Sequence, residues 1–400
     1  MKKTNYLFNL ILLFILCIPG NEAFGVFNTC LKLVTYGAFC WSLLNFVCMK
    51  LFREKTLVLM SAFLLWEVFS SILNRTQVAG CIENIIPFFT AAILFFLLFR
   101  SNPSGALSDI SSIFAIIMLG QYISLKTHML GTIWDQKRVV YNYLLGYRVN
   151  INKIIIFAIC ICVHNIVVNG GMISYAKLLV TLFSGIDFVL EEGVATSVLG
   201  LVIYGMVILF SLVIRSKKIW RNTLIAIIVI VFTFAFIGNT SYFQVVLVDF
   251  LKKDLTLNGR TFLWQQAIRE LNGLHWIIGN GYGHGYVFRL GNDFAVNATH
   301  NQYLTTIFNY GLIGLFLYAL MEFNMIKKTI TGDQTIDPNI LGSIIALLIM
   351  QIPASTIERV YFYIFYVFCC YKGIAVREPR RSVRFSPIRI KHRGLKRSLY

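Results

Sequence analysis

The stretch VATSVLGLVIYGMVILFSLVI, residues 194–214, contains 21 residues and no charged side chain. A helix of about 20 apolar residues spans the ~30 Å hydrocarbon core of a bilayer, so this run predicts a transmembrane helix. Similar runs flank it on both sides. Of the 400 residues, 57% are hydrophobic and only 14% are charged, which is too little polar chain to cover a soluble core of this size. The sequence therefore predicts a polytopic membrane protein.

Apolar runs of this kind predict an all-α fold with about twelve transmembrane helices. The predicted spans are residues 5–19, 29–49, 56–73, 82–99, 109–125, 151–168, 173–190, 194–214, 221–238, 301–321, 339–353 and 357–371. The first run follows two lysines, as in a signal peptide, but no small-x-small cleavage site follows, so we interpret it as an uncleaved helix. We expect one membrane domain over residues 1–376 and a basic tail over residues 377–400.

Basic residues determine the predicted orientation. They cluster around Arg53, Lys217 and Lys327, and nine more fall in the tail. Because Lys and Arg accumulate in cytoplasmic loops, both termini are predicted to be cytoplasmic, which requires counting the segment 173–190 as a span. The net charge of +18 then reflects topology and contact with anionic membrane lipids, and we do not expect a nucleic acid partner. The large outer loop 239–300 lies between spans nine and ten.

This outer loop contains a predicted amphipathic helix. Apolar residues recur there at helical spacing, namely Leu263, Trp264, Ala267, Ile268 and Leu271. Such a helix is suited to lying at the membrane surface. Arg260 precedes it, where a helix N-terminus favours an anion. A phosphate site and an arginine that reaches to lipid headgroups are both consistent with this position.

Alternating glycines follow in the stretch WIIGNGYGHGY, residues 276–286. Neither a Walker loop nor a Rossmann context surrounds them. Their backbone can form an anion-binding nest or a flexible hinge, and we favour the hinge. His284 has no evident partner, so we expect it to be a surface histidine.

His300 and Asn301 come next, at the start of the tenth span. Thr299 or Asn301 can cap that helix. Histidine, with an unperturbed pKa of about 6.5, can also take up a proton near neutral pH. The outer segments contain no Asp-x-Asp, no ligand cluster at metal spacing, no glycosidase-like carboxylate pair and no Gly-x-Ser-x-Gly. We therefore expect chemistry that uses arginine, histidine and backbone dipoles, with no metal and no cofactor.

Three stretches together resemble the bacterial O-antigen ligase and Wzy-type polysaccharide polymerase family. They are NGRTFLWQQAI (258–268), WIIGNGYGHG (276–285) and HNQYLTTIFNYGLIGLFLY (300–318). Members of that family carry a Gly-Arg before a Trp-bearing helix, a Gly-x-Gly turn and a His-Asn-x-Tyr-Leu in one outer loop. The resemblance implies transfer of a glycan from polyprenyl pyrophosphate to a second acceptor at the outer, periplasmic face of the bacterial inner membrane.

The same resemblance implies roles for individual residues. Arg260 would bind the departing pyrophosphate, and His300 would accept the proton of the attacking sugar hydroxyl. The candidate substrate-binding residues are Asn301, Arg269, Arg289, Lys252 and Tyr282. Relatives often carry Ser-Arg-Gly at the end of the preceding span, whereas residues 238–244 here read GNTSYFQ. Either Lys252, Arg289 or Arg75 supplies the missing cation, or the site of this chain differs from that of its relatives.

The favoured hypothesis is a polymerase that joins lipid-linked repeat units into an O-antigen, capsule or exopolysaccharide, with a chain-length regulator as a conceivable partner. A ligase that transfers the finished chain to lipid A core uses the same chemistry. A non-enzymatic flippase or transporter of lipid-linked glycan is the alternative from another class. It would need charged residues inside spans, for which Lys177 and Asp187 are the only central candidates.

Overall fold

The computed structural model describes residues 3–18, 25–135, 138–141, 143–145, 148–192, 195–214, 216–237, 260–290, 294–296, 299–330, 337–354 and 359–371. Within them, a helix overlaps each of the twelve predicted spans. These helices are α1 (Lys3–Cys17), α2 (Val26–Cys48), α3 (Lys55–Leu73), α4 (Val78–Ser101), α5 (Pro103–Thr127), α6 (Arg148–Asn169), α7 (Gly171–Glu192), α8 (Ala195–Val213), α9 (Lys217–Ile237), α13 (Gln302–Ile330), α14 (Pro338–Met350) and α15 (Val360–Tyr371). Lys252, residues 238–244 and the tail 377–400 lie outside the described residues.

Seven of the described helices are long and apolar enough to cross a membrane: α2, α3, α4, α5, α7, α8 and α13. Helices α1, α6, α14 and α15 are apolar over shorter lengths. Large apolar side chains lie exposed on the bundle surface, such as Leu179 on α7 (66%) and Leu209 on α8 (65%), as expected of residues that face lipid. The multi-pass, helical membrane fold is confirmed, whereas the count of twelve crossings and the orientation stay predictions.

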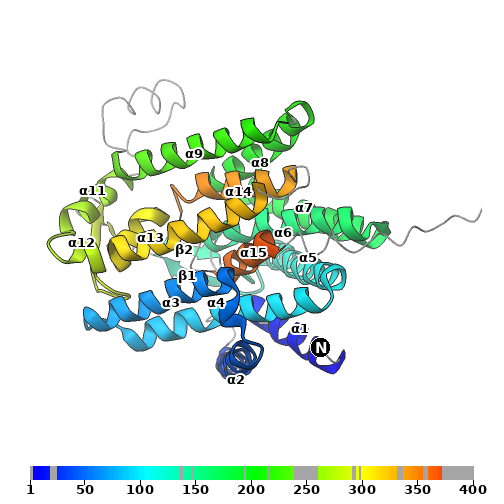
Figure 1. The fold of residues 1–400 in the computed structure, drawn as a ribbon, viewed down its shortest axis with the longest axis horizontal. Helices are drawn as coiled ribbons and strands as arrows, with labels where there is room; N and C mark the ends of the chain where they lie inside the picture. The colour runs from blue at the N-terminus through cyan, green and yellow to red at the C-terminus, as the bar shows by residue number, and fades with distance from the viewer. Residues whose placement is uncertain are drawn as a thin grey trace, which may run out of the picture.

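Helices α4 and α15 form the centre of the bundle (Figure 1). Every residue from Thr90 to Phe99 of α4 and from Tyr361 to Cys370 of α15 is buried. Their rings pack directly, since Phe88 stacks on Tyr363 with centroids 4.9 Å apart. A helix that is apolar on all sides belongs in the interior. Helices α1, α2, α3 and α5 pack around α4, and α13 and α6 pack around α15.

Local sequence signals fix the start of two helices. The side chain of Asn102 accepts a hydrogen bond from the Gly105 amide (3.1 Å) at the start of α5, and that of Asp337 accepts one from the Asn339 amide (3.0 Å) at the start of α14. In both helices proline occupies the first helical position, where its missing N–H costs nothing. A side-chain cap of this kind contributes about 1 kcal/mol.

Both charged residues of the least regular predicted span have partners on α5. Lys177 Nζ donates to the carbonyl oxygen of Ser108 at 2.9 Å, and Asp187 forms an ion pair with Lys126 at 2.9 Å. Glu191 approaches the same Lys126 ammonium at 2.7 Å. These contacts explain why α7 remains one helix despite its charges. They also explain why a basic residue, Lys126, is retained on the predicted outer side, because two carboxylates pair with it.

Among the described residues, two short hairpins interrupt the helical pattern. Strands β1 (Thr132–Asp135) and β2 (Arg138–Tyr141) pair antiparallel, as do β3 (Phe288–Leu290) and β4 (Phe294–Val296). Strands of three or four residues are too short to produce a clear alternating pattern, so the sequence did not predict them. The described residues also form the 3₁₀ turn η2 (Leu51–Arg53) and the helices α11 (Arg260–Glu270) and α12 (His275–Ile278).

Candidate functional site

Helix α11 is the predicted amphipathic helix of the outer loop, and it begins at Arg260. Its apolar side chains Leu263, Trp264 and Ala267 are buried, as is Leu271 directly after its last residue. They face protein, because α11 packs against β3 and α13. The apolar face thus serves a protein contact, whereas the position of the helix at the membrane surface stays a prediction. The hydrophobic spacing correctly predicted a helix with one buried face, but the same spacing serves lipid and protein neighbours equally.

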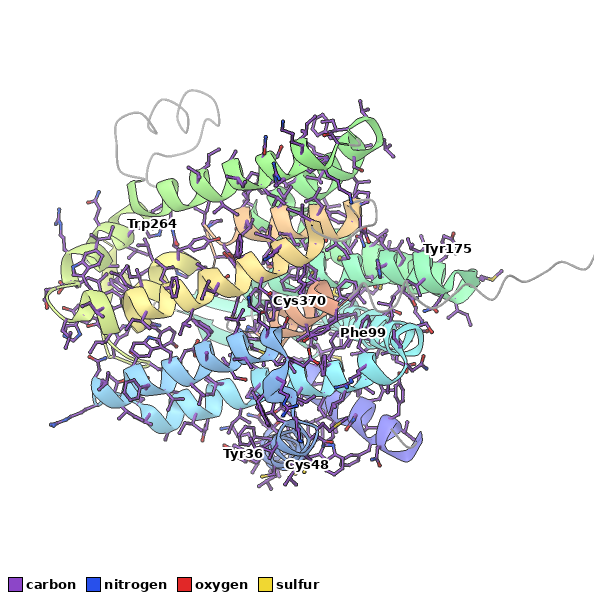
Figure 2. The ribbon with its side chains drawn as sticks, in the orientation of Figure 1. Tyr36, Cys48, Phe99, Tyr175, Trp264 and Cys370 are labelled. Carbon is purple, nitrogen blue, oxygen red and sulfur yellow. The ribbon has the colours of Figure 1, made fainter. Side chains whose placement is uncertain are left out.

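A buried hydrogen bond connects α11 to the residue before His300. The indole Nε1 of Trp264 donates to the carbonyl oxygen of Thr299 at 2.9 Å. Both groups are excluded from solvent, with exposed fractions of 3% and 1%. Figure 2 labels Trp264 at the end of the bundle where α11, α12 and the start of α13 gather. The structure thus brings the chain segments of the two predicted catalytic residues together, although the side chain of Arg260 lies outside the described part.

His300 lies at the junction with α13 in a left-handed backbone conformation, with φ of 54°. Its side chain is half-buried. The next residue caps the helix, since Asn301 Oδ1 accepts a hydrogen bond from the Leu304 amide at 3.1 Å. The Gln302 amide is held by the Gln351 carbonyl at 2.8 Å. A left-handed conformation costs a non-glycine residue about 1–2 kcal/mol, and such residues concentrate at sites whose surroundings impose it.

The Asn301 side chain is fully buried and only partly satisfied. Its oxygen serves the helix cap, while its Nδ2 amide has no hydrogen-bond partner among the described residues. A buried donor without an acceptor is costly, about 1–3 kcal/mol, so it is expected to find one in water or a ligand. This arrangement supports the predicted substrate-binding role, which stays a prediction.

The segment 279–286, called the glycine turn below, packs onto a break in α13. At Gly311 the helix has φ of 66° and ψ of −169°, and the carbonyl groups before the break are released from helical bonding. The amide of Asn280 donates to the Phe308 oxygen at 2.9 Å, and that of Gly281 to the Asn309 oxygen at 2.8 Å. From α3, Trp66 Nε1 donates to the Tyr310 oxygen at 2.7 Å. The broken helix is thus completed by partners from outside it.

Glycine is required on both sides of this contact. A Cβ atom at Gly279 would lie 2.2 Å from the Asn309 oxygen, and one at Gly311 would lie 2.1 Å from the Ile277 oxygen. The amide of Tyr282 is also engaged, with the hydroxyl of Ser71 at 2.9 Å. Because these amides bond to protein atoms, the turn forms a fixed contact between α3 and α13. It is neither the hinge that we favoured nor an anion-binding nest at these amides.

His284 is not the surface histidine expected from the sequence. Its ring packs edge-on against Phe308 with centroids 4.9 Å apart, and its Nδ1 accepts a hydrogen bond from the Tyr286 amide at 2.9 Å. Burial lowers the pKa of His284, partly opposed by a hydrogen bond to Asn309. The imidazole is therefore neutral at pH 7 and contributes to the packing of the turn on α13.

The glycine turn is also tied to the end of α11. The Tyr286 hydroxyl donates to the Glu270 carboxylate, and this hydrogen bond is the main cause of a raised pKa of Tyr286. Of the predicted substrate-binding residues, Arg269 is exposed on the last turn of α11, and Tyr282 is half-buried. Both lie on elements attached to the segment of His300, which is compatible with their predicted role.

Sequence reasoning overlooked a carboxylate near the start of α13. Glu67 of α3 is buried and lines a small cavity of about 20 Å³ together with Tyr282, Gln302 and Asn309. A space of this size holds about one water molecule. The available signal was a carboxylate inside an apolar span, which marks a functional position by default in membrane proteins. We considered only Lys177 and Asp187 under that rule.

Of the three cations predicted as possible replacements for the missing arginine, only Arg75 has a described side chain. Arg75 lies exposed in the turn between α3 and α4. The same turn contacts the glycine turn, since Cβ atoms placed at Gly281 and Gly283 would meet Thr76 and Gln77. The backbone of Arg289 pairs with Ala295 in the β3–β4 hairpin, but its side chain lies outside the described part, as does Lys252.

Comparison with known proteins confirms the resemblance. Residues 180–319 match the Wzy_C family model, described as O-antigen ligase. A stretch of 114 residues is 31% identical to the exopolysaccharide production protein ExoQ of Rhizobium meliloti (strain 1021), over 25% of this chain and 26% of that protein. The chain thus aligns with about a quarter of the length of the curated relative it matches. The family match includes α11, the glycine turn, His300 and the break in α13.

Proposed function

Since residues 180–319 form an O-antigen ligase family domain of a multi-pass membrane protein, we propose that the chain is a glycosyltransferase that polymerises polysaccharide. In the proposed reaction, a sugar hydroxyl of a lipid-linked repeat unit attacks the anomeric carbon of a glycan held on polyprenyl pyrophosphate. A glycosidic bond forms, and the bond from that carbon to the pyrophosphate oxygen breaks. The hydroxyl proton passes to a base, and polyprenyl pyrophosphate leaves as an anion.

The hydrogen bond between Trp264 and Thr299 is the observation that carries this proposal. It holds the helix that begins at Arg260 beside the residue before His300. In the proposed mechanism His300 accepts the proton from the attacking hydroxyl. Arg260 and the amides of the first turn of α11 stabilise the departing pyrophosphate. Base and anion site are then presented by two segments joined through one buried contact.

Other residues of the site contribute to binding in this proposal. The buried Nδ2 of Asn301 donates to a substrate oxygen. Arg269 and Tyr282 contact the glycan from the adjoining elements. Arg75 supplies the second cation for the pyrophosphate, ahead of Lys252 and Arg289, because its turn packs on the glycine turn. The site faces the periplasm if the charge-based orientation holds.

Specific observations bear on the two alternative functions, a ligase and a transporter. The description of the family as O-antigen ligase favours a ligase, whereas the name of the matched relative, an exopolysaccharide production protein, favours chain synthesis. The two activities share their chemistry and differ in the acceptor. A transport pathway through the spans receives little support from Lys177 and Asp187, because both are engaged with α5.

The test is the glycan ladder of a deletion strain complemented with wild type, His300→Ala or Arg260→Ala, with membrane expression checked for each. His128→Ala is a matched control, because His128 is also a non-glycine residue at positive φ, 48°. Arg221→Ala, an exposed arginine of α9, is the second control. We expect both site variants to leave single repeat units on the acceptor, while both controls restore the ladder.

Three other outcomes change the assignment. An acceptor without any glycan in the deletion strain identifies a ligase. A normal ladder from well-expressed His300→Ala removes His300 from the reaction. Lipid-linked units that stay on the cytoplasmic side in the deletion strain identify a flippase.

A further inference from the structure

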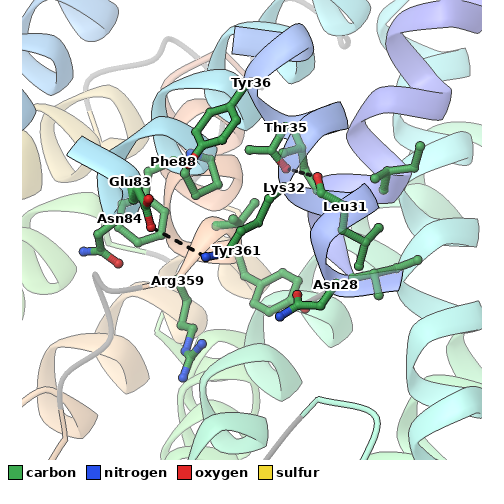
Figure 3. Close-up of a pocket in the computed structure, with 15 residues that line it drawn as sticks. Asn28, Leu31, Lys32, Thr35, Tyr36, Glu83, Asn84, Phe88, Arg359 and Tyr361 are labelled. Atoms are coloured by element: carbon green, nitrogen blue, oxygen red, sulfur yellow. Dashed lines mark hydrogen bonds and ion pairs between the residues drawn. The ribbon is translucent and has the colours of Figure 1, made fainter. Parts of the chain in front are cut away.

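A second, larger cavity is lined by residues outside the family domain. It has a volume of about 350 Å³ and lies between α1, α2, α4 and α15 (Figure 3). This volume falls in the range of about 300 to 1,000 Å³ that is usual for small-molecule sites. All of its described lining residues fall outside residues 180–319. The proposed catalytic groups do not use it, so its chemistry requires a separate explanation.

Groups that can hydrogen-bond a ligand surround this cavity. Lys32 of α2 and Glu83 of α4 approach each other across it at 3.6 Å, and both side chains remain more than half exposed. The side-chain amides of Asn28 and Asn84 make no hydrogen bond with any described residue. Together they offer several donors and acceptors at fixed positions.

Aromatic rings supply the other walls. Tyr361 is anchored, because its hydroxyl donates to the Cys17 carbonyl at 2.6 Å, and Phe88 is anchored by stacking on Tyr363. Tyr36 completes the wall on the side of α2. Rigid rings beside amides and a charge pair suit a molecule with apolar faces and many hydroxyl groups. That is the chemistry of a saccharide.

The charge balance also favours a saccharide over a free anion. Glu83 neutralises most of the charge of Lys32 at their separation of 3.6 Å. Arg359 is the other cation of the lining. A pyrophosphate in this cavity would meet the Glu83 carboxylate, whereas sugar hydroxyls can bond to both members of the pair.

The cavity borders the proposed catalytic segment. Asn84 and Phe88 line it and also line the small cavity that Gln302 and Thr306 share. Gln302 is the first residue of α13 and lies two positions after His300. One layer of side chains from α4 therefore separates the larger cavity from the first turns of α13.

We propose that this cavity binds a saccharide of the acceptor repeat unit. The inference rests on the proposed function, in which two glycans must be held at once. The donor has its pyrophosphate at α11, so the acceptor needs a separate place from which its hydroxyl can reach the donor. Helices outside the family domain then select the acceptor, while the family domain provides the chemistry.

The test uses purified full-length protein in lipid nanodiscs and lipid-linked repeat units extracted from the deletion strain. Asn28→Trp fills the cavity from the first turn of α2, and Val26→Trp, at a residue 83% exposed, adds the same bulk outside it. Lys32→Met removes one member of the ion pair. Lys55→Met, at an exposed residue outside the cavity, is its control.

We expect Asn28→Trp and Lys32→Met to raise the KM for the lipid-linked unit at least about tenfold, equivalent to about 1.4 kcal/mol of binding. Both controls should match wild type. Equal KM values for Asn28→Trp and Val26→Trp would overturn the inference. If wild type itself fails to elongate the units, the proposed function is wrong. A binding measurement then tests the saccharide site on its own. Wild type should then bind the lipid-linked unit more tightly than bare polyprenyl pyrophosphate, and Asn28→Trp should abolish that difference. Equal affinity of wild type for the two lipids would refute the saccharide site.

Discussion

Replacing Trp264 by phenylalanine should loosen the connection between α11 and the residue before His300. The phenyl ring keeps most of the buried apolar contact but has no N–H for the Thr299 carbonyl, which is 2.9 Å from the indole nitrogen. That carbonyl lies on a residue with an exposed fraction of 1%, so solvent does not replace the lost donor.

The expected magnitudes follow from this geometry. An unsatisfied buried carbonyl costs about 1–3 kcal/mol, so the variant should melt a few degrees lower than wild type. The loss of catalytic rate should be larger than this loss of stability. A displacement of reacting groups by about 1 Å costs on the order of a hundredfold in rate. We therefore expect kcat to fall between about tenfold and a hundredfold, with a smaller change in KM.

Elongation of extracted lipid-linked repeat units by the reconstituted protein measures this effect. Trp276→Phe is the matched control, because Trp276 of α12 is partly buried and its indole makes no hydrogen bond within the described residues. Wild-type kcat in a well-folded Trp264→Phe protein would refute the argument that this bond aligns the two segments. An equal loss in Trp276→Phe would show that the effect is general to the loop.

Three further perturbations test other parts of the structure. Gly311→Ala should reduce the yield of folded protein in membranes severalfold, because residue 311 has φ of 66° and its Cβ would lie 2.1 Å from a carbonyl oxygen. The control Gly205→Ala, whose Cβ would have no atom within 4 Å, should keep the wild-type yield. Gel filtration measures both yields. His284 has a folded pKa below its unfolded value of 6.5, so the unfolded state binds more protons near and below that pH, and the free energy of unfolding should fall as pH drops from 7.5 to 5. Melting curves of His284→Gln should lack that part of the pH dependence. Identical pH profiles for the variant and wild type would contradict this prediction. Asp187→Asn should retain elongation activity, because its ion pair is partly exposed and contributes little, whereas a transporter that uses this carboxylate would lose function.

The helices were predictable from the sequence because length and apolar composition are local properties. Even α7 was predicted correctly, although its Lys177 and Asp187 weaken the pattern, since the charge rule required one more crossing. The buried faces were less predictable. The spacing of apolar residues in α11 revealed that one face is hidden, but it could not distinguish a lipid surface from a protein partner.

The arrangement of the site was beyond local patterns. Glycine spacing showed that residues 279–285 have conformational freedom, but the reason for it lies in α13 and α3. The bond from Trp66 to the Tyr310 carbonyl joins residues 244 positions apart. His300 and Arg260 were suggested by resemblance, whereas the contact that joins their segments depends on how the loop folds back.

The break at Gly311 has a consequence for how the protein is made in the cell. Three carbonyl groups, those of Phe308, Asn309 and Tyr310, are satisfied by α3 and by the glycine turn. Unpaired carbonyl groups in hydrocarbon cost several kcal/mol each, so the tenth predicted span is a poor insertion substrate on its own. α3 is synthesised long before it, whereas the glycine turn comes immediately before it and, in the predicted orientation, must first cross the membrane. Translocation of the loop should therefore precede stable insertion of α13, and the loop acts as an intramolecular chaperone for the helix that follows it.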